Sequence, residues 1–154
     1  IQLDLNQPER FDLTCVNEKG EKERIVMIHS AITGSFERCI AVLLEHLNGS
    51  LPTWLSPVQA RVLPIADNHK AFAEDTLAQL KAAGIRADLD DSNDTLGKKI
   101  RQAKVEKIPY TLVVGDAEVA AGTATLESRD LGKVGALSVA DITEKLKTEI
   151  ANRT

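Results

Sequence analysis

From residue 58 onward, short apolar segments alternate with longer segments of helical periodicity, and this alternation constrains the fold more than any other feature. The apolar segments predict strands over residues 58–65, 85–88, 110–114 and 123–128. The periodic segments predict helices over residues 68–83 and 94–106, and a last helix that begins near Ser138. A turn is expected after Gly115. Strands that alternate with helices are typical of an α/β layer with parallel pairing in its first half.

Residues 1–50 have a different pattern, in which short strands predominate. Apolar and polar residues alternate over residues 1–5, which indicates a half-buried strand that needs neighbours for its backbone groups. A hairpin is expected over residues 11–29, and a helix over residues 35–46. The proline-containing residues 50–57 are interpreted as a linker into a second domain. We infer that the first part of the chain belongs to a larger sheet.

The composition bounds the class of protein. The 154 residues suffice for one ordinary domain, or for a small domain plus a piece of another. Because aromatic residues make up only 3% of the chain and hydrophobic residues 43%, we expect an aliphatic core. The net charge of −4 argues against a general nucleic-acid coat protein and against binding to anionic membranes, but not against a local RNA-binding face. No apolar run has the length of a membrane span, and Cys15 and Cys39 suggest reduced thiols in a cytoplasmic protein.

Two residues near the start of the expected helix over residues 35–46 are candidates for binding chemistry. The Gly34-Ser35 turn places Arg38 in the first helical turn, where backbone N–H groups favour anions and a guanidinium can bind a phosphate. An arginine in that place is more often solvated or salt-bridged. His29 is a candidate metal ligand, although a histidine after an apolar run is more often part of a packed core. The residues alone leave both alternatives open.

Three further stretches occur in an order that is specific to one family. They are Pro8-Glu9-Arg10-Phe11-Asp12, Trp54-Leu55-Ser56-Pro57-Val58-Gln59 and Ile108-Pro109-Tyr110-Thr111-Leu112-Val113-Val114-Gly115-Asp116-Ala117-Glu118. Over nearly its whole length the chain resembles the C-terminal part of threonyl-tRNA synthetases. The resemblance implies that residues 1–52 are the C-terminal remnant of a class II catalytic domain with motif 3, an antiparallel sheet plus a helix. It implies that residues 53–154 are an anticodon-binding domain, an α/β fold with a five-stranded mixed sheet and three helices.

The resemblance also implies roles in catalysis for residues of the first part. Arg38 would hold ATP while the adenylate forms, and Gln2 and Ser35 would line the pocket for ATP and threonine. His29 would be one of three zinc ligands. The other two zinc ligands of the family have no counterpart in this sequence, so we expect this segment alone to bind no zinc and to be inactive. Ser30 departs from the family, which has an arginine after this histidine.

In the second part, the resemblance implies that Asn93 and Glu118 read the anticodon. Their donors and acceptors suit the exposed edges of unstacked bases. Glu127 departs from the family pattern, which has an arginine that pairs with an anticodon base. Because a carboxylate repels phosphate and cannot make the same contacts, Arg129 is the candidate to take over that role.

A local excess of positive charge lies between Asn93 and Pro109. The basic residues are Lys98, Lys99, Arg101, Lys104 and Lys107. They can follow the phosphates of an RNA, or they can form an ordinary solvated helix face. Gly97 costs the expected helix about 1 kcal/mol relative to alanine. Either a close approach of RNA or close packing of the helix would explain this glycine.

We therefore expect the chain to be part of a threonine–tRNA ligase, which activates threonine with ATP and Mg²⁺, uses zinc, transfers threonine to tRNA(Thr) and acts as a homodimer. The alternative is a diverged synthetase paralogue that serves as a non-catalytic RNA- or protein-interaction module, and Ser30 and Glu127 support it. A small-molecule-binding α/β domain is a weaker reading, because no glycine-rich phosphate loop follows any expected strand.

Overall fold

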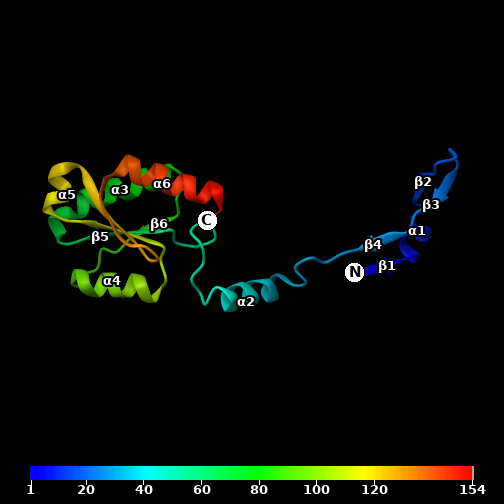
Figure 1. Cartoon of the computed structure of the whole chain (residues 1–154), viewed down its shortest axis with the longest axis horizontal. Coiled ribbons are helices and arrows are strands. Elements are labelled where there is room, and N and C mark those ends of the chain that lie inside the picture. The colour runs from blue at the N-terminus through cyan, green and yellow to red at the C-terminus, as the bar shows by residue number, and fades with distance from the viewer. Residues whose placement is uncertain (154) are drawn as a thin grey trace. The chain divides into compact units, whose positions relative to one another are not determined.

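The computed structural model describes residues 1–153 and divides the chain into two compact units (Figure 1). Unit 1 comprises residues 1–43, and unit 2 comprises residues 44–154. Each unit is described by itself below. The expected domain boundary after residue 52 stays a prediction.

Unit 1 contains two small antiparallel ladders. Strand β1 (Gln2–Asp4) pairs with β4 (Met27–His29), and β2 (Thr14–Val16) pairs with β3 (Lys22–Arg24). The expected hairpin is thus present, and its turn is closed by Asn17, whose Oδ1 accepts hydrogen bonds from two backbone N–H groups of the turn. The burial expected for β1 is absent among the described residues, since Leu3 within the strand and Leu5 just after it are exposed.

Two helices complete unit 1 and lead into unit 2. The sequence did not predict the short α1 (Asn6–Arg10), which begins where Asp4 Oδ1 accepts hydrogen bonds from the N–H groups of Asn6 and Gln7. The expected second helix is α2 (Phe36–His46). It is amphipathic, yet none of its residues is buried. Its apolar stripe therefore contributes little to the stability of the described chain.

Unit 2 is built on a five-stranded mixed sheet with the strand order β6-β5-β7-β8-β9. The strands are β5 (Ala60–Pro64), β6 (Ala87–Leu89), β7 (Tyr110–Val114), β8 (Thr123–Ser128) and β9 (Gly132–Ser138). Strands β6, β5 and β7 are parallel, whereas β8 and β9 are antiparallel to their neighbours. The expected α/β fold with parallel pairing in its first half is therefore confirmed.

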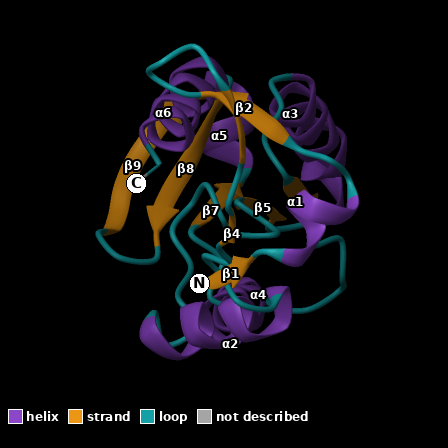
Figure 2. Cartoon of the chain, turned by 90° about the vertical axis from the view of Figure 1, so that its right-hand side faces the viewer, coloured by secondary structure: helices purple, strands orange, loops and turns teal. Residues whose placement is uncertain are grey.

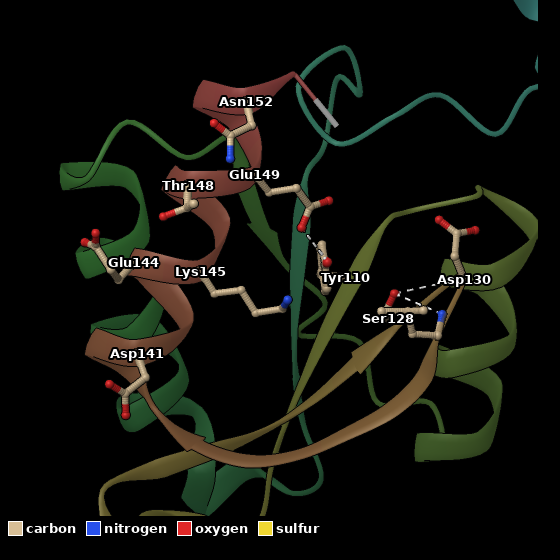
Figure 3. A pocket seen from close by; sticks show the side chains of 10 residues that line it. Tyr110, Ser128, Asp130, Asp141, Glu144, Lys145, Thr148, Glu149 and Asn152 are labelled. Atoms are coloured by element: carbon tan, nitrogen blue, oxygen red, sulfur yellow. Dashed lines mark hydrogen bonds between the residues drawn. The ribbon is translucent and has the colours of Figure 1, made fainter.

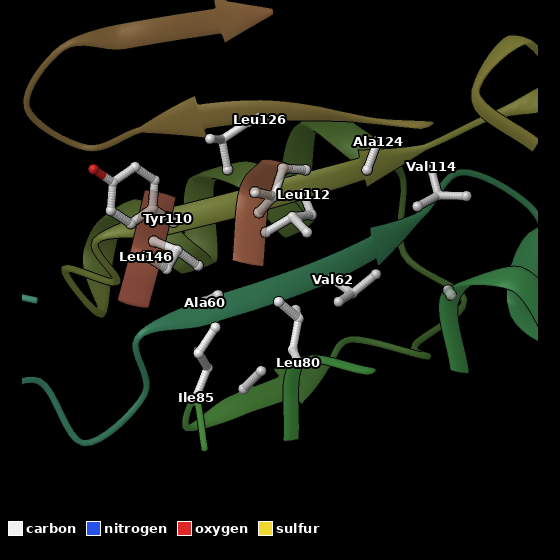
Figure 4. Packing of buried hydrophobic residues seen from close by; sticks show 13 residues of the cluster. Ala60, Val62, Leu80, Ile85, Tyr110, Leu112, Val114, Ala124, Leu126 and Leu146 are labelled. Atoms are coloured by element: carbon white, nitrogen blue, oxygen red, sulfur yellow. The ribbon is translucent and has the colours of Figure 1, made fainter. Parts of the chain in front are cut away.

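Helices cover both faces of this sheet. They are α3 (Lys70–Ala82), which follows a short 3₁₀ turn (Asp67–His69), α4 (Leu96–Val105), α5 (Asp116–Ala121) and α6 (Val139–Asn152). Figures 1 and 2 show α3 and α6 on one face and α4 on the other. The aliphatic core lies under α3 and α6, where Leu80, Ile142 and Leu146 pack against alternate strand residues such as Val62 and Leu112 (Figure 4). Burial of these side chains is the main favourable term for this unit.

Two elements of unit 2 correct the sequence-based expectation. The turn expected after Gly115 is the helix α5, so the domain has a fourth, short helix. The sequence did not locate β9, which contains Gly132 and Gly135 and pairs along β8. The N-cap expected at Ser138 is confirmed, because its Oγ accepts a hydrogen bond from the N–H of Asp141 over 3.1 Å.

The segment over residues 48–57, which includes the expected linker over residues 50–57, is hydrogen-bonded to the rest of unit 2. Arg86 Nη2 donates hydrogen bonds of 2.8 Å to the carbonyl groups of Trp54 and Ser56. Gln59 Nε2 donates to the carbonyl of Thr53 over 2.9 Å. These bonds satisfy carbonyl groups that a flexible linker would leave to water. In the described residues, no helix is long and apolar enough to cross a membrane.

Candidate nucleic-acid interface

The carboxyl ends of the three parallel strands meet at one edge of the sheet. Residues 65–69 follow β5, residues 90–95 follow β6, and residues 115–118 follow β7. We call these three segments the carboxyl edge. In open α/β sheets this edge is the usual place for a ligand, because loops from neighbouring strands converge there while the sheet holds them rigid. Both Asn93 and Glu118 belong to the carboxyl edge.

A pocket of about 310 Å³ lies between the first two of these segments, and we call it the edge pocket. Asn93 lines it and is exposed, so its amide is free to reach a ligand. Ile65 lines the same pocket from the segment after β5. A Cβ atom added to Gly115 would lie 2.7 Å from Cδ1 of Ile65, so the segment after β7 also approaches this point. The structure therefore brings the Asn93 loop and the start of α5 to the same part of the edge.

Glu118 has a partly structural role at the start of α5. Its Oε2 accepts a hydrogen bond from the N–H of Gly115 over 3.1 Å, and its Oε1 accepts one from Thr125 Oγ1 over 2.7 Å. The bond from Thr125 is the main reason why the pKa of Glu118 lies below its ordinary value. The carboxylate is half-buried. Each oxygen still has a second lone-pair site, so the group can also accept from a base.

A buried histidine joins two segments of the carboxyl edge. His69 is almost fully buried, and its Nδ1 accepts a hydrogen bond from the N–H of Ala66 over 3.2 Å. The other ring nitrogen, Nε2, therefore carries the hydrogen and donates it to Asp116 Oδ1 over 2.9 Å. Asn68 Nδ2 donates to the same oxygen over 3.3 Å. This contact fixes the start of α5, and with it Glu118, against the segment that follows β5.

A buried lysine joins the other pair of segments. Lys99 is only 3% exposed, and its Nζ donates to the carbonyl groups of Pro64 over 3.1 Å and Asp90 over 3.0 Å. It thereby connects the end of β5 to the loop after β6. The sequence analysis counted Lys99 only as a surface charge. Its spacing of four residues from the buried Ala103 was the signal that it lies on the inward stripe of α4.

Most of the basic side chains expected to form a surface for RNA are paired with other groups of the chain. Lys98 pairs with Asp94 over 2.8 Å, and Lys104 pairs with Glu127 over 2.9 Å. Lys107 Nζ donates to the carbonyl of Asn48. Of the five cations, Arg101 alone has no hydrogen bond or ion pair with another side chain or backbone group within residues 1–153. Within the described part of the chain, helix α4 therefore does not present a continuous row of unpaired cations for the phosphates of an RNA.

Arg129 lies away from Asn93 and Glu118, at the opposite edge of the sheet. Its backbone N–H donates to the carbonyl of Pro109, just before β7 begins. The guanidinium is mostly buried and donates through Nη1 to the carbonyl groups of Leu51 and Lys107, both over 3.0 Å. It also forms two hydrogen bonds to Asp130. The structure thus gives Arg129 the role of an anchor for the segment over residues 48–57.

The same opposite edge contains a shallow polar pocket of about 620 Å³ (Figure 3). Tyr110 and Glu149 point toward one another there, and the Tyr110 hydroxyl donates to Glu149 Oε2 over 2.6 Å. Burial of the phenol, together with this carboxylate, raises the pKa of Tyr110. Thr53 Oγ1 donates to the other carboxylate oxygen of Glu149. The network holds the segment over residues 48–57 against α6, and this structural role explains why these polar side chains lie together.

The expected catalytic residues form two separate pairs in unit 1. Ser35 Oγ accepts hydrogen bonds from the backbone N–H of Arg38 over 3.2 Å and from its Nε over 3.3 Å, so Ser35 is the N-cap of α2. Gln2 lies opposite His29 in the β1–β4 ladder. No hydrogen bond or ion pair within residues 1–153 joins one pair to the other.

A metal does not fit the donors of this chain alone. His29 Nε2 lies 2.9 Å from Asp4 Oδ2, and Asp4 Oδ1 already accepts hydrogen bonds from the first N–H groups of α1. The hydrogen bond from Gln7, followed by the one from His29, lowers the pKa of Asp4. Among the described residues, no group of three or more histidine, cysteine, aspartate or glutamate side chains is arranged to hold a metal ion.

The chain is similar to known proteins over nearly its whole length. A threonine–tRNA ligase from Natranaerobius thermophilus is 49% identical over 150 residues, which are 97% of this chain and 24% of that protein. One from Maridesulfovibrio salexigens is 51% identical over 97% of this chain and 23% of that protein. The chain therefore spans about a quarter of the length of the curated relatives it matches.

Solved structures show the same likeness. The RNA-binding domain of threonyl-tRNA synthetase from Cryptosporidium parvum superposes with a TM-score of 0.85 at 36% identity, over 96% of this chain and 38% of that chain. A prolyl-tRNA synthetase from the same organism shares the fold, with a TM-score of 0.68 at 21% identity, over 94% of this chain and 31% of that one. The family model described as the anticodon binding domain matches residues 59–149. Because this match covers more than half of the sequence and coincides with the sheet of unit 2, the chain belongs to the family of anticodon-binding domains.

Proposed function

We propose that the carboxyl edge of unit 2 binds the anticodon of tRNA(Thr), and that the chain is the anticodon-reading part of a threonine–tRNA ligase. The likeness at 36% identity to a domain described as the RNA-binding domain of threonyl-tRNA synthetase carries this proposal. The exposed amide of Asn93 beside the edge pocket supports it from the geometry. Unpaired anticodon bases present donors and acceptors that an amide and a carboxylate can read.

The residues of unit 1 would serve the ligation reaction of the parent enzyme. In this proposal Arg38, fixed by Ser35, binds the phosphates of ATP with its Mg²⁺, and Gln2 lines the threonine pocket. A guanidinium neutralises the leaving pyrophosphate without losing a proton. His29 would be one ligand of a zinc ion that selects threonine by its amino and hydroxyl groups. The remaining ligands, and the cover for exposed side chains such as Leu3 and Leu5, would come from other parts of a homodimeric enzyme in the cytoplasm.

The RNA-binding part of the proposal is tested with the 154-residue chain and an RNA stem-loop carrying the anticodon GGU. The wild-type chain should bind this stem-loop more tightly than one with a scrambled loop. Asn93→Ala should weaken binding by about tenfold, the cost of one or two lost hydrogen bonds to a base. Glu118→Gln is preferred to alanine, because an amide oxygen can still accept from Gly115 and preserve α5. Unchanged affinity in both variants, with intact folding, would rule out reading by these two residues.

The catalytic part of the proposal has its own test. We expect the 154-residue chain alone to show no ATP–pyrophosphate exchange with threonine, because Arg38 and His29 are only part of the required set of ligands. Measurable exchange would show that the active site is complete within this chain. The substitution Arg38→Ala in the parent enzyme should abolish exchange while RNA binding persists.

The second candidate is a diverged paralogue that binds RNA or protein without aminoacylation. Glu127, which replaces the arginine of the family pattern, is the observation in its favour, and Lys104 pairs with it. The identities of 49% and 51% with proteins described as threonine–tRNA ligases favour the ligase instead. If the chain binds a threonine-anticodon stem-loop no better than a scrambled one, the result would favour the paralogue hypothesis.

A further inference from the structure

We propose that Lys99 contacts RNA directly, by donating one hydrogen of its ammonium group to the carbonyl oxygen of an anticodon base in the edge pocket. The proposal rests on the proposed function, since it assumes that an anticodon occupies the carboxyl edge. It goes further by adding a buried cation to the binding residues and by stating which class of base it selects.

The hydrogen-bond count of Lys99 is the first observation. An ammonium group has three hydrogens to donate. Within residues 1–153, Nζ has two acceptors, the carbonyl groups of Pro64 and Asp90. Lys99 is 3% exposed, so bulk water does not readily supply a third. Lys99 also lines the edge pocket, together with Asn93. A ligand in that pocket can therefore complete the coordination of a buried charge, and a hydrogen bond from a charged donor is strong.

The charges around the pocket identify the kind of acceptor. Asp67, Asp94 and Lys70 also line it. Asp67 pairs with Lys70 over 2.8 Å, and Asp94 pairs over 2.8 Å with Lys98, which does not line the pocket. The two carboxylates and the two ammonium groups of the lining balance, so the pocket has no net positive charge with which to attract a phosphate. They suit a neutral ring instead, because a carboxylate accepts from a ring N–H while the ammonium donates to a carbonyl oxygen. A volume of about 310 Å³ is at the lower end for ligand pockets and admits a flat ring.

The base chemistry follows from the genetic code. Threonine codons pair with anticodons that end in guanine and uracil. Guanine and uracil both present a carbonyl oxygen next to a ring N–H, whereas adenine and cytosine present an amino group next to an unprotonated ring nitrogen. Lys99 can donate to the carbonyl oxygen of guanine or uracil, and Asp67 or Asp94 can accept from the ring N–H beside it. Adenine and cytosine present an amino group and an unprotonated nitrogen at these places, so they fit less well. The pocket therefore selects one of the two fixed anticodon bases.

Lys99→Met in the 154-residue chain tests this assignment, with Lys81→Met as a matched control on the exposed side of α3. Binding to the GGU stem-loop is measured by titration, and folding is checked by circular dichroism. Lys99→Met should weaken binding about tenfold or more, and the control less than about twofold. Two further stem-loops each lack one carbonyl oxygen and the ring N–H beside it, with 2-aminopurine for the central guanine or 2-pyrimidinone for the last uracil. Loss of the ring N–H affects wild type and Lys99→Met alike. For one of them, wild type and Lys99→Met should bind equally.

The analogues separate a direct contact from a purely structural role. If Lys99 only braces the loops, Lys99→Met will lose the same factor with all three stem-loops, and the proposal is overturned. If Lys99→Met does not fold, the ammonium resonance of Lys99 in the wild-type chain is followed by NMR. It should shift when the GGU stem-loop is added and remain unshifted with one analogue; a shift with both analogues, or with none of the RNAs, contradicts the contact. Equal binding of wild type to a scrambled stem-loop would reject the proposed function itself.

Discussion

The Nζ atom of Lys104 lies 2.9 Å from Oε1 of Glu127, so helix α4 and strand β8 share an ion pair on the face of the sheet opposite α3 and α6. Glu127 is the position at which the resemblance led us to expect an arginine. Its carboxylate is only 23% exposed, whereas Lys104 is 61% exposed and reaches over from α4. A positive charge is therefore still present at this place, but it comes from the helix rather than from the strand.

This pair predicts a measurable coupling in stability. Lys104→Met and Glu127→Gln should each destabilise the chain slightly, and the double variant should lose less than the sum. We expect a coupling energy of about 0.5 kcal/mol, because one partner is largely exposed to water. Urea unfolding of the four proteins measures it. The charge exchange Lys104→Glu with Glu127→Arg should restore most of the stability that Glu127→Arg alone loses. Strict additivity in the cycle would show that the two side chains do not interact in solution.

For substitution of Gly97 by alanine we expect opposite effects on stability and on RNA binding. The structure excludes one of its two explanations, since a Cβ atom at Gly97 would meet nothing within 4 Å, and close helix packing is therefore not the reason for this glycine. Gly97→Ala should stabilise α4 by about 0.5–1 kcal/mol. Close approach of RNA is the explanation that remains, and it predicts weaker binding of the GGU stem-loop by the stabilised variant. Thermal unfolding and RNA titration are compared on the same sample. A gain in stability with unchanged affinity would show that RNA does not approach Gly97.

For substitution of Arg129 we expect a loss of stability without a loss of RNA binding. Its guanidinium satisfies the carbonyl groups of Leu51 and Lys107 and is mostly buried. Arg129→Met leaves both acceptors and the Asp130 carboxylate without their donor, and we expect a loss of about 1–3 kcal/mol in urea unfolding. Below the unfolding transition, affinity for the GGU stem-loop should match that of the wild type. A clear loss of affinity in the folded variant would restore the role in anticodon reading that the sequence suggested.

The contact between His69 and Asp116 predicts a pH dependence of stability in the acidic range. The hydrogen bond from His69 holds the pKa of Asp116 below its ordinary value of 3.8 in the folded chain. A lowered carboxyl pKa contributes stability that is complete above the unfolded pKa and is lost as the pH falls through the folded value. Asp116→Asn keeps an acceptor for His69 but cannot titrate. The stability of wild type relative to this variant should therefore be larger at about pH 6 than at about pH 3. A difference that stays constant with pH would mean that Asp116 is not held in this way.

The sequence alone determined the secondary structure of unit 2 wherever periodicity was strong. The strand over residues 110–114 and the strand over residues 123–128 lie where the pattern placed them, and the last helix begins after Ser138 as its N-cap predicts. The sequence analysis missed α5 because a six-residue helix has too little periodicity to detect. This helix is stabilised by the hydrogen bond that Glu118 accepts from the N–H of Gly115. Strand β9 was missed because glycines weaken the strand signal, so that pairing with β8 defines this strand.

Only the tertiary structure decided what the charged side chains do. Lys99, Lys104 and Arg129 look alike in the sequence as surface cations, yet one is buried under carbonyl groups, one neutralises Glu127 and one anchors a distant segment. The physical reason is that local periodicity reports which residues share a face of a helix or strand, whereas the strand order decides which faces meet. The pairing of β5 with both β6 and β7 brings three loops to one edge, and that arrangement places Asn93 and Lys99 in one pocket and Glu118 on the segment after the neighbouring strand.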